Sequence, residues 1–274
     1  MLPGVYFASK KNGATYYRAS ITYHGKHISL GSFQTELHAN KAYLLAGKIL
    51  SEDVNLAFED YHPEGILSFH KWVVLHNLKM NKIYFKNPIY LRSKYFLYYL
   101  DKNTALKFDV DDLFYYAHHK ILRRGGHLFV TDYGMQVNLL SRYGIINYAV
   151  AGRDYLFVNG DETDFRYGNI KLINHYHGVF QVLRKGRPEY LAKIHINGDY
   201  QIGRYRTEAE AAIAYNKAVA ILRDHGFHKR YTLNYIDGVD EIAYASMYQR
   251  IRISRKLFTF AETHSVQANQ YPLP

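Results

Sequence analysis

Apolar residues recur at steps of three and four in two stretches of the chain, one near residue 42 and one near residue 214. This spacing is typical of a single buried stripe on an amphipathic helix. The two stripes match at one constant offset, so the chain contains an internal repeat. The matching positions are Ala42, Tyr43, Ala46, Ile49 and Leu50 in the first copy, and Ala214, Tyr215, Ala218, Ile221 and Leu222 in the second. Thr207 and Glu210 have the spacing of a capping box, which predicts where the second helix begins.

Three short strands are predicted before each helix, at about residues 5–9, 16–23 and 27–33 in the first copy. His24-Gly25 and Asn197-Gly198 supply hairpin turns between the second and third strands. Ala19 and Ala192 lie at matching positions, where a small side chain would let the helix approach the sheet closely. Each copy is therefore expected to be a three-stranded antiparallel sheet with one helix across its back, and the other face of the sheet is left exposed.

Further elements are predicted between and after the two copies. Helices are expected over residues 63–80 and 239–257, and residues after Glu262 are expected to form a loose tail. The second of these helices has a basic end, which suits either phosphate contacts or a solvated helix face; its cations are Arg250, Arg252, Arg255 and Lys256. In the centre of the chain, strands are expected at 89–91 and 96–100. A helix that begins with acids is expected at 109–122, and a strand at 127–131 after a Gly-Gly turn.

These elements make the chain an α+β protein. Small sheet-plus-helix domains are expected at residues 1–60 and 177–236. A connecting helix is expected at 61–82, a central module at 83–176, and a C-terminal helix and tail at 237–274. A length of 274 residues suits two or three domains with cores of their own.

Composition narrows the possible partners. The formal net charge is +11, and a strongly basic protein most often binds a polyanion, with nucleic acid as the default candidate. The 28 tyrosines have three open explanations: codon bias, stacking on bases, or filling of a core. The chain has no cysteine, no apolar run long enough to cross a membrane, and no apolar stretch of a signal peptide at its start. We therefore expect a cytoplasmic or nucleoid-associated protein of a bacterial host cell, with no membrane partner.

Residues 155–174, YLFVNGDETDFRYGNIKLIN, resemble the C-terminal half of an HNH homing endonuclease core, whose usual wording is V-D-H-I-N-G-x-x-x-D-N-R-x-x-N-L. Five scaffold positions match: Asn159, Gly160, Asp164, Arg166 and Asn169. The two catalytic letters are lost, because Leu156 replaces the Asp and Phe157 replaces the His that activates water. Phe165 and Ile170 are further departures. The family's upstream metal ligand is a His on a preceding strand, and Leu140-Ser141-Arg142 stand there instead.

The resemblance implies a central HNH-like ββα module that lacks its chemistry. Residues 155–174 should form a strand, a loop and a short helix, with Leu156 and Phe157 buried. No catalytic residue, metal or cofactor is expected. Other candidate ligands are weak: Asp132 and Asp154 are lone acids in predicted loops, His118 and His119 point apart on a helix, and His175 with His177 forms a single pair without cysteines.

The two end copies resemble the APETALA or ethylene-response-factor DNA-binding domain. Its wording, G-V, A-x-I, L-G-x-F and T-x-x-x-A-x-x-A-Y, recurs twice in the same order, over about 1–60 and 177–236, with Ile202-Gly203-Arg204-Tyr205 in place of L-G-x-F in the second copy. Segments around Asn55 and Asn234 echo the L-N-F that closes that domain. In the family, the exposed sheet face lies in the major groove of DNA. The corresponding residues here are Tyr6, Lys10, Arg18, Ser20, Thr22, His27 and Ser29 in the first copy, and Phe180, Arg184, Lys193, His195 and Gln201 in the second.

Charge placement favours a phosphate-facing surface over a merely solvated one. Residues 1–34 contain four Lys or Arg residues and no acid, and the acids begin at Glu36. The leading hypothesis is a non-enzymatic, sequence-specific protein that binds a bipartite site on double-stranded DNA. Such a protein fits a transcriptional repressor of phage or mobile-element origin, derived from a homing endonuclease. The alternatives are an active HNH nuclease with a displaced catalytic residue, and a structural or protein-inhibiting role for the aromatic surface. The operator, the regulated process and the oligomeric state do not follow from the sequence.

Overall fold

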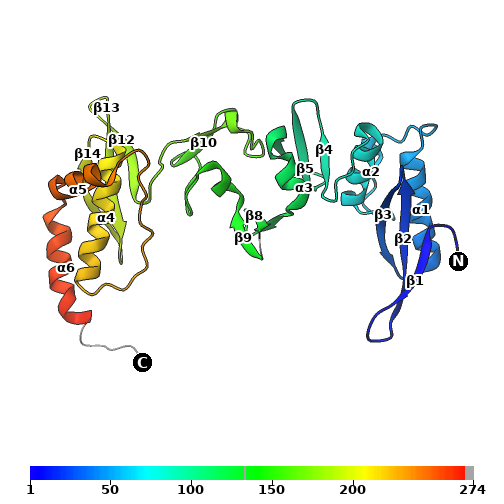
Figure 1. The fold of residues 1–274 in the computed structure, drawn as a ribbon, viewed down its shortest axis with the longest axis horizontal. Coiled ribbons are helices and arrows are strands. Elements are labelled where there is room, and N and C mark those ends of the chain that lie inside the picture. The colour runs from blue at the N-terminus through cyan, green and yellow to red at the C-terminus, as the bar shows by residue number, and fades with distance from the viewer. Residues whose placement is uncertain (133, 269–274) are drawn as a thin grey trace. The chain divides into compact units, whose positions relative to one another are not determined.

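A computed structural model describes residues 1–132 and 134–268. The chain folds into small antiparallel sheets with helices packed against them. Within those residues there are four three-stranded sheets, one two-stranded sheet and six α-helices, so the chain is α+β (Figure 1). The chain divides into two compact units. The first comprises Met1–Leu139 and Val158–Asn169, and the second comprises Leu140–Phe157 and Ile170–Pro274.

The first unit begins with the predicted sheet and helix. Strands β1 (Val5–Ser9), β2 (Thr15–Tyr23) and β3 (Lys26–Phe33) pair antiparallel in that order, and helix α1 (Glu36–Leu50) lies across them (Figure 1). The β2–β3 turn needs two residues of positive φ, and His24 and Gly25 supply them at 45° and 73°. Thr35 caps α1 by accepting a hydrogen bond from the backbone of His38. The buried core between them contains Val5, Ala19, Ile28, Leu30, Ala39, Ala42, Ala46 and Ile49.

The next helix is shorter than predicted. Helix α2 (Phe69–Asn81) begins after Ser68, whereas the sequence pattern predicted a start at residue 63. The Ser68 hydroxyl accepts a hydrogen bond from the backbone of Lys71 and so caps the helix there. The chain before it turns tightly, with the backbone N–H of Gly65 bonded to the carbonyl of His62. Trp72 on α2 is buried in the first core, and its indole N–H donates to the carbonyl of Phe58 at 2.8 Å.

Two sheets follow in the first unit. The strands β4 (Ile89–Leu91), β5 (Tyr95–Asp101) and β6 (Thr104–Asp109) form one, and β7 (Ile121–Arg124), β8 (His127–Asp132) and β9 (Met135–Asn138) form the other. The prediction of one helix over 109–122 is wrong. A 3-10 turn at Val110–Asp112 leads into a short helix, α3 (Leu113–His118), and the backbone becomes extended at His119. Pairing of Ile121 with Val130 draws the end of the segment into a sheet.

The second unit contains the second copy of the repeat. Strands β12 (Val179–Arg184), β13 (Arg187–His195) and β14 (Asp199–Tyr205) pair in that order, and helix α4 (Glu208–Asp224) packs against them (Figure 1). The predicted capping box of Thr207 and Glu210 is present at the start of α4. The turn at Asn197-Gly198 differs from the first copy, because a three-residue loop joins His195 to Asp199.

The two copies share details that the sequence pattern did not contain. The strand pairing shifts by one residue after Ala19 in the first copy and after Ala192 in the second. Gly4 and Gly178 adopt φ values of 71° and 69°, and each lies against the tyrosine ring of its own helix. A Cβ atom would come within 2.0 Å of the Tyr43 ring at Gly4, so only glycine fits there.

The C-terminal region also differs from the prediction. The single helix predicted over 239–257 is two helices, α5 (Glu241–Arg250) and α6 (Arg255–Ala268), with an extended link between them. Tertiary hydrogen bonds hold this link, one of which runs from the backbone N–H of Ser254 to the carbonyl of Ile202 on β14. The tail predicted to be loose after Glu262 continues as α6 to Ala268, because Leu257 and Ala261 are buried in the second core. Residues 269–274 lie outside the described part.

Candidate nucleic-acid interface

The outer face of the first sheet brings most of the predicted residues together. Cross-strand partners point to the same side of a sheet, so the pairs Tyr6–Arg18 and Thr22–His27 share the face opposite to α1. Tyr6 is 54% exposed, and Arg18, Thr22, His27 and Ser29 are exposed as well. Lys10 is exposed in the turn after β1 rather than on the sheet itself.

Arg18 is held in position on this face. Its guanidinium group donates a hydrogen bond to the hydroxyl of Tyr16 at 2.7 Å and lies 5.4 Å from the centre of the same ring. These contacts restrict the side chain while its other N–H donors stay available. Ser20 is the least accessible of the predicted contact residues on this face. Ser20 pairs with Ser29 and so shares the face, but it is only 7% exposed.

The outer face of the second sheet is more mixed in charge. Lys193 is half-buried and pairs with the exposed Gln201, and His195 pairs with Asp199. The His195 ring nitrogen Nδ1 lies 2.9 Å from the Asp199 carboxylate. Arg184 lies at the hairpin end with its guanidinium 3.9 Å from Glu189. Neither acid is among the residues that the family resemblance implied, although strand alternation places both on this face.

A segment of the second unit lies over part of this face, and no local pattern in the sequence predicts it. Residues 146–148, 153 and 154 line a pocket of about 220 Å³ together with Phe180, Lys193 and His195. The guanidinium of Arg153 lies 5.1 Å from the centre of the Phe180 ring, so Phe180 is half-buried rather than open to a ligand. Tyr148 in the same segment is 95% exposed and has a φ of 66°, a conformation that costs energy for a residue of this size.

Asp154 anchors this covering segment. It is 2% exposed and accepts hydrogen bonds from the backbone of Val150, the guanidinium of Arg153 and the side chain of Asn174. Asn174 in turn accepts one from the backbone of Gln181 on β12. Burial raises the pKa of the Asp154 carboxyl, but the hydrogen bonds from Arg153, Asn174 and Val150 outweigh burial and lower it. The carboxylate therefore connects residues 146–154 to the sheet.

The segment that resembles an HNH core forms a hairpin around a loop. Strands β10 (Tyr155–Phe157) and β11 (Ile170–Leu172) pair antiparallel. The short helix predicted after the loop is only a three-residue 3-10 turn, Tyr167–Asn169, and β11 follows it directly. Leu156 and Phe157 were predicted to be buried, but both are half-buried. Adjacent residues of a strand point to opposite faces, and a two-stranded ribbon by itself covers neither face.

The residues of that segment that match the HNH wording stabilise the loop within the first unit. Asp164 is fully buried and accepts two hydrogen bonds from the Arg166 guanidinium, at 2.8 and 2.6 Å, and one from Asn159 at 3.1 Å. Asn169 donates to the carbonyl of Asp164 and accepts from the backbone of Asn159. Burial raises the pKa of Asp164, but hydrogen bonds from Arg166 and the charge of Lys107 outweigh burial and lower it to about 2. These residues thus have a structural role that needs no catalytic neighbour.

Several of the other candidate ligands have a local partner. His119 lies 3.4 Å from Asp132, and His175 lies 2.9 Å from Glu208. The ring of His118 bonds to the carbonyl of Phe114. Among residues 1–132 and 134–268, no three His, Cys, Asp or Glu side chains are grouped closely enough to hold a metal ion. Within the same residues, no helix combines the length and the apolar character needed to cross a membrane.

Comparison with known proteins adds no relative to this picture. No family model, curated protein or solved structure matches the chain. The resemblances to the HNH and APETALA-type domains therefore stay predictions.

Proposed function

We propose that the chain is a non-enzymatic protein that binds double-stranded DNA and regulates transcription by occupying its site, in the manner of a phage repressor. The observation that carries the proposal is the outer face of the first sheet. Arg18, Thr22, His27 and Ser29 are exposed there beside the Tyr6 ring, and residues 1–34 contain no acid.

The face suits a duplex for physical reasons. The major groove of B-DNA admits a small β-sheet, and its base edges present donors and acceptors that Arg, His, Thr and Ser side chains complement. Restraint of Arg18 by Tyr16 lowers the entropy lost when its guanidinium binds a base or phosphate. The net charge of +11 favours association with the phosphate backbone at a rate that depends on salt.

The second sheet supports a second, weaker half-site. Its face offers Lys193, Gln201 and Arg204, but residues 146–154 cover one side and Asp199 adds negative charge. We therefore expect the first sheet to contribute more of the sequence preference. A bipartite site follows, with one half for each sheet.

The absence of chemistry is part of the proposal. Leu156 and Phe157 offer neither a base nor a metal ligand, and the retained Asp164 is enclosed by Arg166 and Asn159. Supercoiled plasmid incubated with the protein and magnesium, manganese or zinc should remain intact. Nicking that disappears on replacement of Asp132 or Asp154 would support an active nuclease instead.

The direct test is selection of bound duplexes from a random pool, followed by titration of the recovered site at several salt concentrations. We expect one preferred bipartite sequence and an affinity that falls steeply with salt. The test variant is Arg18→Gln, and its matched control is Lys41→Gln, because Lys41 is exposed on α1 at the back of the same sheet. Equal binding of all sequences by the wild type, or equal losses in the two variants, would contradict recognition by the sheet face.

A further inference from the structure

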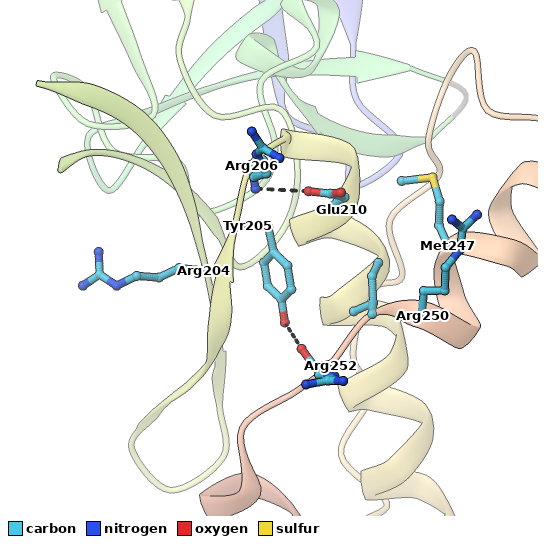
Figure 2. A pocket seen from close by; sticks show the side chains of 8 residues that line it. Arg204, Tyr205, Arg206, Glu210, Met247, Arg250 and Arg252 are labelled. Atoms are coloured by element: carbon cyan, nitrogen blue, oxygen red, sulfur yellow. Dashed lines mark hydrogen bonds between the residues drawn. The ribbon is translucent and has the colours of Figure 1, made fainter. Parts of the chain in front are cut away.

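A basic pocket lies at one edge of the second sheet, outside the faces described above. It has a volume of about 440 Å³, and four arginines belong to its lining: Arg204, Arg206, Arg250 and Arg252. Figure 2 shows the Tyr205 ring directed into the space between β14 and the α5–α6 link, with Arg206 and Arg252 at its two ends. Arg204 extends from the opposite side of β14, where it shares the outer sheet face with Leu191 and Phe180.

The positive charge of this pocket is poorly compensated. Its one acid, Glu210, accepts hydrogen bonds from the backbone N–H groups of Arg206 and Thr207 at 3.1 and 3.2 Å, as part of the α4 capping box. Within the described residues, no carboxylate forms an ion pair with any of the four guanidinium groups. Arg250 donates to Ser246, and all four side chains are exposed.

The α5–α6 link that carries Arg252 is fixed by three contacts with the repeat. The Tyr205 hydroxyl donates to the carbonyl of Arg252 at 2.9 Å (Figure 2). The Lys217 ammonium donates to the carbonyl of Ile251 at 2.9 Å, and the backbone N–H of Ser254 donates to Ile202 at 2.7 Å. Tertiary hydrogen bonds therefore fix the break between the two helices, and Arg250 and Arg252 on either side of Ile251 both line the pocket.

We propose that this pocket binds phosphate groups of the DNA backbone that flanks the second sheet, an inference that rests on the proposed function. When a sheet lies in the major groove, the two phosphate walls of the groove run past its edge strands, and β14 is an edge strand here. The planar guanidinium fork matches two phosphate oxygens, and its charge is retained at any physiological pH. The Arg204 side chain lies on the outer side of β14, so the phosphate contacts of the pocket fall to Arg206, Arg250 and Arg252.

A charge-matched pair of variants tests the site. The pocket variant is Arg250→Gln with Arg252→Gln, and the control is Arg223→Gln with Arg230→Gln. Both control arginines are exposed, and Arg223 lies at the opposite end of α4 from the pocket. Each variant loses two positive charges, and thermal unfolding confirms that both are folded. The measurement is the slope of log affinity against log salt for a selected duplex.

The pocket variant should lose about 0.9 of slope for each phosphate contact removed, hence about 2 in total, while the control keeps the wild-type slope. The preferred sequence should not change, because phosphate contacts carry no sequence information. Equal slopes in the wild type and both variants would overturn the pocket assignment and leave the proposed function intact. Equal losses in the two variants would also overturn it, in favour of diffuse charge.

Two further outcomes separate the remaining explanations. A wild-type protein that binds no duplex would overturn the inference together with the proposed function. Titration with inorganic phosphate in the absence of DNA, followed by NMR, examines a free anion as the ligand. Phosphate binding that the pocket variant alone loses, with an unchanged salt slope for DNA, would assign the pocket to a small anion and refute the backbone contact.

Discussion

Replacement of Asp164 by Asn should destabilise the first unit strongly although the change adds and removes no bulk. The carboxylate is fully buried and accepts hydrogen bonds from Arg166 and Asn159, and the Lys107 ammonium lies 3.6 Å away. An asparagine keeps one oxygen but turns an NH₂ group toward one set of these donors. The loop then retains two cations without the charge that compensated them.

The magnitude follows from the pKa of the carboxyl. Its value falls from 3.8 to about 2 in the folded chain, and a shift of one unit corresponds to about 1.4 kcal/mol. The charged form therefore contributes about 2 kcal/mol. Loss of a buried ion-pair partner costs about 3–5 kcal/mol when the remaining charge stays buried. The Arg166 side chain is 39% exposed and can turn to water, so we expect a loss of about 2–4 kcal/mol for Asp164→Asn.

Urea unfolding followed by the fluorescence of Trp72 measures this loss, because Trp72 is the only tryptophan and lies in the same unit. Asp111→Asn is the control, since Asp111 is exposed and the change in charge is equal. The folded pKa of Asp164 lies below its unfolded value, so the stabilisation is complete above about pH 5. It disappears as the pH falls from 3.8 toward 2. A loss below 1 kcal/mol at pH 7, or an equal loss at pH 2, would refute this account.

Three further predictions concern the core and the interface. Gly178→Ala should destabilise the second unit by about 2–4 kcal/mol in thermal unfolding, because the new Cβ would lie 2.4 Å from a tyrosine ring at a φ of 69°. Gly238→Ala is the control: Gly238 has a φ of 73° but open space around it, so the change should cost only about 1 kcal/mol. Burial is the chief reason that the pKa of His76 is lowered from 6.5 to about 4. The free energy of unfolding should therefore fall by about 2–3 kcal/mol as the pH drops from 6.5 to 4. Urea titrations of His76→Phe should no longer show this pH dependence. Arg18→Ala and Lys193→Ala should each weaken binding of a selected duplex by about 1–3 kcal/mol and combine additively, and unchanged affinity in both would exclude the sheet faces.

Local signals in the sequence were sufficient for the repeated sheet and helix. The turn at His24-Gly25, the cap at Thr207 and the apolar stripe that contains Ala42 all act between residues close in the chain. The structure has the corresponding elements at nearly the predicted positions. Ala19 and Ala192 are fully buried under their helices, as the spacing indicated. Periodicity succeeded here because one face of each element is buried against its neighbour in sequence.

Helix ends, by contrast, depended on partners far along the chain. The extended link after Arg250 is held by Tyr205, Lys217 and the carbonyl of Ile202, none of which periodicity can associate with it. The helix predicted over 109–122 ends early because Ile121 pairs with Val130. A weak local preference for helix gives way wherever a strand or a distant donor offers the backbone a better hydrogen bond.

The availability of the predicted interface was likewise decided by tertiary structure. The resemblance to the APETALA-type domain implied that Phe180 and Ser20 lie on the outer faces, and the strand register has both there. Whether such a residue is open to a ligand depends on what else covers the sheet. The Arg153 guanidinium lies over the Phe180 ring because buried Asp154 connects residues 146–154 to Asn174 and β12, and Ser20 is only 7% exposed. Alternation determines the side on which a residue lies, whereas exposure depends on packing between segments distant in sequence.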